Sequence, residues 1–419
     1  MVNLLKRFLK GGTPTILAAA TQGFGLIQLL LLVGGSGATK ESDAYFYLIS
    51  WAQLPTQVVL SGYAYPVWLS ASTPARRFRF VLLATPIFTS IGVVVGSVLF
   101  GRLSGGYSGL VGHTVLFVLL GVMLSLGWAL ALRRSAEGDT VWISSVTLVS
   151  NVLSCLVLLG ALGAPSVVKV SAMVSAQLIG LLAYLILILA RNRGLWRRVI
   201  SAGDGSDLSA SSPAARHEWF LLQAAGGYGA MLSIQTVAAA LPASALSVLG
   251  LVGRFSSGLT NVVTNAIVPR LIHRESQTGA VAFNYLRLLA VVVGCSLPIL
   301  TVVAALPTFE GIAQLVATSI LVLAWFLAAA LNATTKRVAV RFLSPRISLL
   351  SLALNISSAV ALLALLALGR PTLVAVLLAS ISLDLLPGVC LAVLLRRPWV
   401  AVAITAVVIA SLIAAAPHL

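Results

Sequence analysis

The segment TPTILAAATQGFGLIQLLLLVGG, residues 13–35, carries no charged side chain over its whole length. It supplies the roughly 20 apolar residues that an α-helix needs to cross the hydrocarbon core of a bilayer. It is too long for the hydrophobic core of a cleavable signal peptide, and no convincing small-residue cleavage site ends it. We therefore predict that it is a retained first membrane span, preceded by the basic residues Lys6, Arg7 and Lys10.

Comparable apolar segments recur along the whole chain of 419 residues. Hydrophobic residues make up 59% of the sequence and charged residues only 9%, whereas about a quarter of the residues in soluble domains are charged. A chain of this composition cannot present a water-compatible surface on all sides, so we predict an all-α polytopic membrane protein. The predicted spans are residues 13–35, 43–70, 78–101, 109–132, 140–162, 167–190, 217–240, 243–269, 281–306, 308–331, 346–368, 372–395 and 399–416.

The net charge of +17 reports membrane topology, not a nucleic-acid partner. A nucleic-acid-binding protein gathers its basic residues on one folded face, but here they lie between the apolar segments. With the N-terminus in the cytoplasm, almost all 27 basic residues fall on the cytoplasmic side, as the positive-inside rule requires. We therefore predict a multi-pass protein of the cytoplasmic (inner) membrane whose C-terminus lies outside. The exceptions are Lys40, Arg102, Lys169 and Arg370 on the outer side and Arg254 within a span.

The spans form two blocks of six with a polar stretch between them. Residues 191–216 are rich in Gly, Ser, Asp and Arg and predict a flexible cytoplasmic linker. Residues 54–69 align weakly with residues 257–272, and both fall on the second helix of their block. Six helices per block make such a repeat parallel, related by an axis along the membrane normal. The predicted domains are a lobe at 1–190, the linker, a lobe at 217–395 and an extra C-terminal transmembrane helix at 396–419.

Arg254 is the strongest candidate functional residue, because it lies near the middle of the predicted span 243–269. A cation costs at least about 2.5–3.5 kcal/mol at this depth and must face protein or water. The guanidinium group suits recognition of a phosphate or diphosphate, which favours an anion-binding role in a cavity. The alternative is a structural ion pair with another helix.

Asp384 is the one acidic residue deep within a predicted span. It could neutralise Arg254, or it could bind Na⁺ or a proton that couples transport, together with Asn355, Ser357 and Ser358 on the preceding helix. Asp384 and Asn355 are therefore the candidate coupling-cation residues. Pro387 frees a backbone carbonyl in the same helix, which fits a cation site but is also common without one.

Four amide side chains within the spans are further candidates for substrate contacts: Gln22, Gln28, Gln57 and Asn261. Hydrogen bonding between helices explains any one of them at least as well. The histidines and cysteines show no metal-ligand spacing, and the chain lacks a phosphate-binding loop. We therefore predict no enzyme, no catalytic residues, no metal site and no cofactor other than a coupling Na⁺ or H⁺.

Two stretches resemble the lipid II flippase (virulence factor MviN-like) branch of the multidrug/oligosaccharidyl-lipid/polysaccharide exporter superfamily. They are GGSGATKESDAYFYLISWAQLP, residues 34–55, and LPASALSVLGLVGRFSSGLTNVVTNAIVPRLI, residues 241–272, which includes an arginine at the place of Arg254. The resemblance implies two six-helix lobes in parallel repeat around a central cavity that opens alternately to either side. The chain departs from the family where Gln22, Gln28 and Gln57 stand instead of arginines, and where a single segment, 399–416, replaces two C-terminal helices.

The sequence as a whole predicts a secondary flippase for a lipid-linked saccharide or another cell-envelope precursor, moved from the inner to the outer leaflet. Its partners would be the lipid bilayer and a polyprenyl-phosphate-linked glycan or similar amphiphile, and its oligomeric state is not indicated. One alternative is an exporter of a free drug, peptide or secondary metabolite, for which a less charged, amide-lined cavity is suited. A second alternative is a non-transporting scaffold for envelope biosynthesis.

Overall fold

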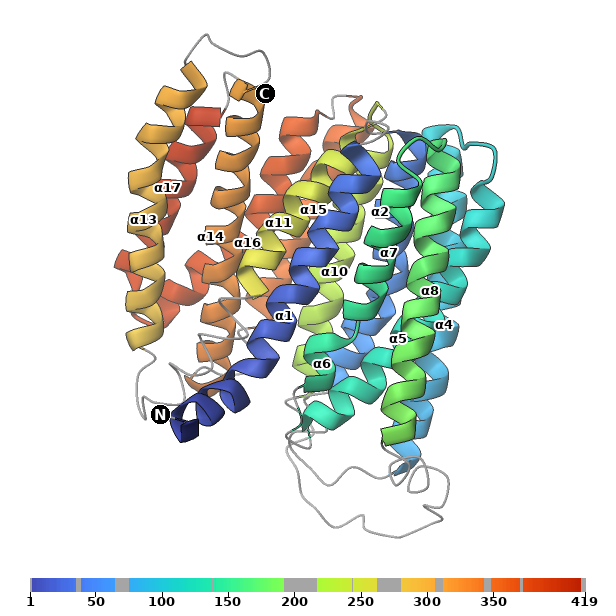
Figure 1. The fold of residues 1–419 in the computed structure, drawn as a ribbon. Coiled ribbons are helices and arrows are strands. Elements are labelled where there is room, and N and C mark those ends of the chain that lie inside the picture. The colour runs from blue at the N-terminus through green and yellow to red at the C-terminus, as the bar shows by residue number, and fades with distance from the viewer. Residues whose placement is uncertain are drawn as a thin grey trace. The chain divides into compact units, whose positions relative to one another are not determined.

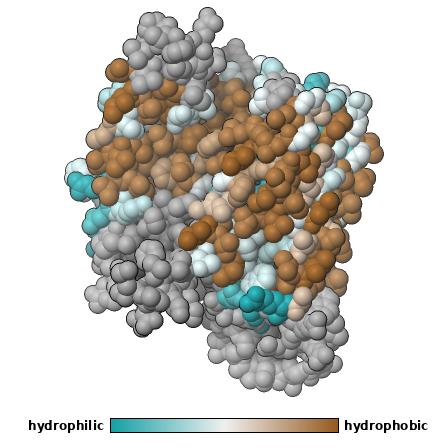
Figure 2. All heavy atoms as spheres, viewed as in Figure 1, coloured by the Kyte–Doolittle hydropathy of each residue, from teal (hydrophilic) through white to brown (hydrophobic). Residues whose placement is uncertain are grey.

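The computed structural model describes most of the chain, and its regular elements are helical throughout the described residues (Figure 1). This confirms the predicted all-α class. Ten of the described helices are long and apolar enough to cross a membrane. Figure 2 shows the face that these helices present, on which hydrophobic side chains predominate. The described residues are 2–34, 39–64, 75–136, 139, 141–191, 217–242, 244–261, 280–305, 312–342, 348–369 and 372–415.

The chain divides into two compact units, Met1–Val248 and Leu249–Leu419. The division falls within helix α11, whereas most of the predicted linker, residues 192–216, lies outside the described residues. The arrangement as two six-helix lobes therefore stays a prediction. The first unit holds α1 (Val2–Gly34), α2 (Lys40–Pro55), η1 (Thr56–Ala64), α4 (Ala75–Ser104), α5 (Leu110–Ala136), α6 (Val141–Ser145), α7 (Leu148–Gly160), α8 (Ser166–Arg191), α10 (His217–Ala239) and the first turn of α11 (Ala245–Asn261).

In the second unit, α14 is the central helix and packs against α13, α16 and α17. The last helix, α17, buries one face against this unit through Val400, Ile404, Val408 and Ser411, at the spacing of three or four residues expected for one side of a helix. Its opposite face, with Trp399, is exposed. The helices of this unit, besides the rest of α11, are α13 (Ala280–Ala305), α14 (Ile312–Phe342), α15 (Ser348–Ala367), α16 (Leu373–Leu394) and α17 (Pro398–Ala415).

The second predicted span is not a regular α-helix. It consists of α2 and then η1, a π-helix that begins directly after Pro55. Proline has no N–H to donate to the carbonyl of Trp51, so the α-helical hydrogen-bond pattern cannot continue there. The helix α4 approaches this carbonyl closely, because a Cβ at Gly92 would lie 3.4 Å from the oxygen of Trp51. π-Helical segments are rare and occur frequently at functional sites. The rest of this predicted span, residues 65–70, lies outside the described residues.

The fifth predicted span is also interrupted, between α6 and α7. The side chains that stabilise the break come from other helices: the hydroxyl of Thr21 donates to the carbonyl of Ser144 at 2.9 Å, and the hydroxyl of Tyr184 donates to the carbonyl of Trp142 at 3.0 Å. Asn151 in α7 donates in turn to the carbonyl of Thr21 at 2.9 Å. These contacts satisfy backbone groups that could not remain unpaired in a membrane interior.

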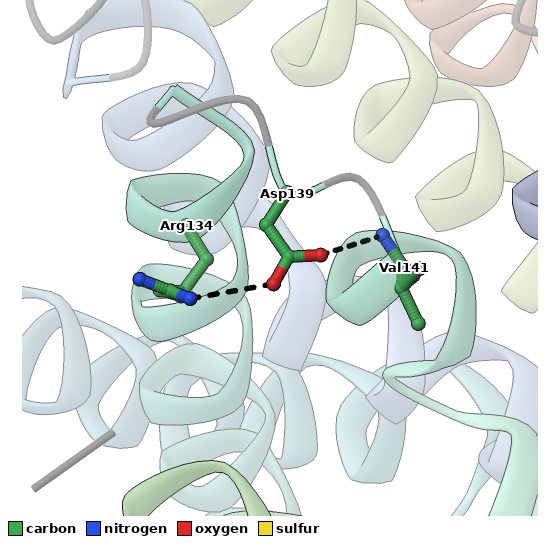
Figure 3. A network of polar contacts seen from close by, with 3 residues as sticks. All are labelled: Arg134, Asp139 and Val141. Atoms are coloured by element: carbon green, nitrogen blue, oxygen red, sulfur yellow. Dashed lines mark hydrogen bonds and ion pairs between the residues drawn. The ribbon is translucent and has the colours of Figure 1, made fainter. Parts of the chain in front are cut away.

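An acidic residue stands just before α6. Figure 3 shows Asp139 between the end of α5 and the first residue of α6. One carboxylate oxygen lies 3.4 Å from the guanidinium of Arg134, and the other accepts a long hydrogen bond, also 3.4 Å, from the backbone N–H of Val141. A negative charge at a helix N-terminus interacts favourably with the helix dipole. The network therefore ties the start of the short helix to α5.

Gly180 allows α8 to pack directly against α7. A Cβ at this position would lie 2.6 Å from the backbone nitrogen of Ser150, which is part of a helix and cannot move aside. We expect Gly180→Ala to lower the free energy of unfolding by about 1–3 kcal/mol, as overpacking does elsewhere. The measurement is the thermal unfolding of the purified protein. Gly23→Ala is the matched control, because a Cβ at Gly23 would meet nothing within 4 Å; equal stability of the two variants would contradict the expectation.

Candidate functional site

Arg254 lies in α11, and its side chain is only partly buried. Among the described residues, its guanidinium group has no hydrogen-bond or ion-pair partner. Its backbone carbonyl accepts a hydrogen bond from the hydroxyl of Ser257 at 3.1 Å. The alternative of a structural ion pair with another helix therefore finds no partner within the described ranges. A cation in this state keeps its hydrogen-bond donors available to a ligand.

Asp384 lies in α16 and is held by two side chains of α14. Its carboxylate accepts a hydrogen bond from Trp325 Nε1 at 3.0 Å and another from Asn332 Nδ2 at 2.8 Å. Lys336, one turn beyond Asn332, interacts with Asp384 electrostatically. Seven residues separate Trp325 from Asn332 and eleven separate it from Lys336, so all three lie on one face of α14. The carboxylate thus has its positive counterpart within the second unit.

Asn355, the other predicted coupling residue, is buried in α15, and its Oδ1 atom has no hydrogen-bond partner among the described residues. Ser382 donates to Ser358 at 3.4 Å, which sets the register of α15 against α16. Asp384 lies two residues after Ser382, which turns it to the side of α16 that contacts α14. Ser357, which the sequence places near the predicted cation residues, donates to the carbonyl of Leu354 within its own helix. Unpaired buried carbonyl oxygens are the ligands that hard cations prefer.

The predicted amide contacts lie in different surroundings. Gln28 is buried and accepts from Gln177 Nε2 at 3.4 Å, and the same nitrogen lies 3.1 Å from the hydroxyl of Tyr45. Gln57, on the π-helix η1, accepts a hydrogen bond from Tyr228 of α10 at 3.0 Å. Gln22 is partly buried in α1. Asn261 is the last residue of α11, and its side chain lies outside the described residues.

Asp43 is a candidate functional residue that the sequence did not single out. It lies in the first turn of α2 and is buried. Its carboxylate accepts hydrogen bonds from the backbone N–H of Ser244 at 2.8 Å, from that of Ser247 at 2.7 Å, and from the hydroxyl of Ser247 at 2.6 Å. The hydroxyls of Ser42 and Ser247 are also 2.8 Å apart. The acid of one helix therefore caps the N-terminus of another, α11.

A second contact reinforces this connection. Tyr47, one turn further along α2 and fully buried, shares a 2.9 Å hydrogen bond with Thr236 of α10. Hydrogen bonds therefore connect the start of α2 to both α10 and α11, which lie about 200 residues later in the chain. In the sequence, a carboxylate at the start of an apolar segment is typical of the solvated end of a span. Only the tertiary contact identifies Asp43 as the residue that caps α11.

Comparisons with known proteins bear on the fold. No protein-family model and no curated protein matches the chain. Among solved structures, the lipid II flippase MurJ in an inward closed conformation matches with a TM-score of 0.60 and 13% identity, covering 96% of this chain and 90% of that chain. A chain described as protein A matches with a TM-score of 0.56 and 16% identity, covering 94% and 96%. The Vibrio cholerae MATE transporter VcmN in its bent form gives a TM-score of 0.46 and 12% identity, covering 98% and 99%.

The first two of these matches cover nearly the whole chain, and at identities of 13% and 16% the likeness concerns the fold alone. The same conclusion follows from the ten described helices that are long and apolar enough to cross a membrane, each of which overlaps a predicted span; the predicted spans 43–70, 217–240 and 243–269 are not among them. The sequence resemblance to lipid II flippases is thus confirmed at the level of architecture. The chain is a multi-pass membrane protein whose fold is similar to that of the lipid II flippase MurJ.

Proposed function

We propose that this protein is a secondary flippase that moves a lipid-linked saccharide or a similar anionic envelope precursor from the inner to the outer leaflet. The observation that carries the proposal is the partly exposed guanidinium of Arg254, which has no ion-pair partner among the described residues. An unpaired cation within a membrane helix is costly unless it meets water or an anionic ligand. Arg254 would hold the phosphate of the cargo, and its forked donors suit that geometry.

The capped start of α11 supports alternating access. Asp43 holds Ser247, and Arg254 lies seven residues further along the same helix, about 10 Å away at the rise of an α-helix. A movement of α11 that breaks the contacts with Asp43 would therefore also move Arg254. The hydrogen bonds of Asp43 would hold the transporter closed in this conformation. Breaking them would open the protein towards the side of the membrane on which α2 begins.

Asp384 and Asn355 would form the coupling part of the same transporter. A Na⁺ or proton bound near Asp384 would compete with its hydrogen bonds to Trp325 and Asn332. Asn355, whose Oδ1 has no partner among the described residues, would supply a further oxygen ligand from α15. The orientation with a cytoplasmic N-terminus is part of the proposal.

An exporter of a free small molecule is the second candidate. The buried amide cluster of Gln28, Gln177 and Tyr45 favours it, because uncharged hydrogen-bonding groups are suited to a neutral cargo. The requirement for Arg254 distinguishes the flippase from the exporter. A diphosphate requires this cation, whereas a neutral molecule does not.

A reconstitution experiment tests the choice of cargo. The full chain is placed in liposomes, and the movement of a labelled polyprenyl diphosphate–disaccharide is compared with that of a neutral-headed analogue and of a labelled free amphiphilic drug. We expect translocation of the diphosphate-linked saccharide and little movement of the other two. Movement of the free drug alone would replace the flippase with the exporter, and movement of none of the three would favour the scaffold.

A further inference from the structure

The indole of Trp325 lies between Asp384 and the helix that carries Arg254. At one end of the ring, Nε1 donates to Asp384 at 3.0 Å. At the other end, the ring faces α11, where a Cβ built on Gly253 would lie 3.2 Å from the ring atom Cη2. The side chain is buried, with 5% of its surface exposed. One rigid side chain therefore contacts both the predicted cation residue and the backbone next to the predicted anion residue.

Gly253 allows the indole to approach the backbone of α11 closely. Because Gly253 has no side chain, the indole edge rests directly on the backbone of α11, immediately before Arg254. A bicyclic ring turns as a unit, so a displacement at Nε1 must appear at the opposite edge. Close-packed interiors transmit such displacements because they contain few voids that could absorb them.

The strength of the hydrogen bond from Trp325 to Asp384 depends on the charge of the carboxylate. Asp384 also accepts from Asn332 at 2.8 Å, and Lys336 of the same helix face contributes the nearby positive charge. A hydrogen bond to an ionised carboxylate is roughly twice as strong as one between neutral groups. Neutralising Asp384, or placing a cation on it, would therefore loosen the bond that fixes the indole.

We infer that Trp325 is a positioning residue that links the state of Asp384 to anion binding at Arg254. With Asp384 ionised and free of a cation, the indole is held against Gly253 and supports α11 in the geometry that binds the anionic head. When Asp384 is occupied, this support is weakened and the anion is held less tightly. The inference rests on the proposed function, because it assumes that Arg254 binds the head group of the cargo.

The test measures the affinity of the purified full chain for geranylgeranyl diphosphate, a prenyl diphosphate without a sugar. Trp325→Phe keeps a ring but removes the N–H, and Asp384→Asn keeps the shape but removes the charge. We expect each to weaken binding roughly tenfold, the effect of one hydrogen bond to a charged group. The double variant should bind no more weakly than either single variant, because both interrupt the same link. Trp399→Phe, on the exposed face of α17, should bind like the wild type.

Gly253→Ala tests the same contact from the other side while leaving both hydrogen-bonding side chains in place. The added methyl group should weaken binding in the wild-type background and weaken it less in the Trp325→Phe background, where the ring is smaller. Multiplicative losses in the Trp325/Asp384 double variant, or wild-type affinity in Gly253→Ala and Asp384→Asn, would overturn the link. If Arg254→Ala alone weakens binding, the proposed function survives that failure. If Arg254→Ala binds like the wild type, the proposed function itself is wrong.

Discussion

Arg254→Ala is expected to lower the rate of translocation of a labelled polyprenyl diphosphate–disaccharide by at least about tenfold in proteoliposomes. Its guanidinium has no protein partner among the described residues, so the substitution removes ligand contacts without leaving a carboxylate unpaired. Hydrogen bonds to a charged group contribute about 1.5–3 kcal/mol each. Loss of even one corresponds to roughly a tenfold to hundredfold weaker complex.

Two control variants make this result specific. Arg254→Lys keeps the positive charge but loses the planar fork, so it should retain an intermediate rate. Arg102→Ala removes an exposed arginine at the end of α4 and should leave the rate unchanged. An Arg254→Ala protein that transports at the wild-type rate would show that the head group is held elsewhere. Similar losses in all three variants would indicate a general effect of charge on the membrane surface.

Asp43→Ala is expected to release the start of α11 and to stop net transport. The carboxylate accepts three hydrogen bonds, from Ser244 N, Ser247 N and Ser247 Oγ, and alanine leaves the buried donors without an acceptor. Each unpaired buried donor costs about 1–3 kcal/mol, which shifts the closed conformation towards one in which water reaches these groups. A shift of this size changes the ratio of the two conformations by about tenfold or more.

Thiol labelling measures this shift. In a background without Cys155, Cys295 and Cys390, a cysteine introduced by Ala245→Cys, in the buried first turn of α11, should react at least about tenfold faster with a membrane-impermeant maleimide after Asp43→Ala. Asp43→Asn keeps one acceptor oxygen and should give an intermediate rate. Unchanged labelling together with normal transport would show that the cap is a static part of the fold.

Sequence hydropathy could predict the helices because the cost of burying charge in a bilayer is a property of each segment by itself. The apolar stretch at 13–35 lies almost entirely within α1, and the final stretch at 399–416 coincides closely with α17. The same reasoning could not predict the π-helix after Pro55 or the break before Leu148. Both depend on neighbours: α4 lies beside the freed carbonyl of Trp51, and Thr21 and Tyr184 bind the carbonyls before the break.

The candidate site likewise has a part that the sequence could predict and a part that it could not. Arg254 and Asp384 could be selected from the sequence because an ionisable residue deep in an apolar segment is conspicuous wherever it occurs. Their roles in transport stay predictions, and their surroundings could not be foreseen. Nothing in the segment around Asp384 indicates Trp325 or Asn332, which lie 59 and 52 residues earlier.

The amino-acid sequence is enough to predict that this chain crosses a membrane as a set of helices, because the hydrophobic effect and backbone hydrogen bonding act locally on each segment. The polar groups that contact one another can be identified from the folded protein alone. Asp43 caps a helix that begins about 200 residues later, and Trp325 lies between Asp384 and Gly253. Such pairings depend on the packing of helices distant in sequence, and the composition of a single helix does not encode its neighbours.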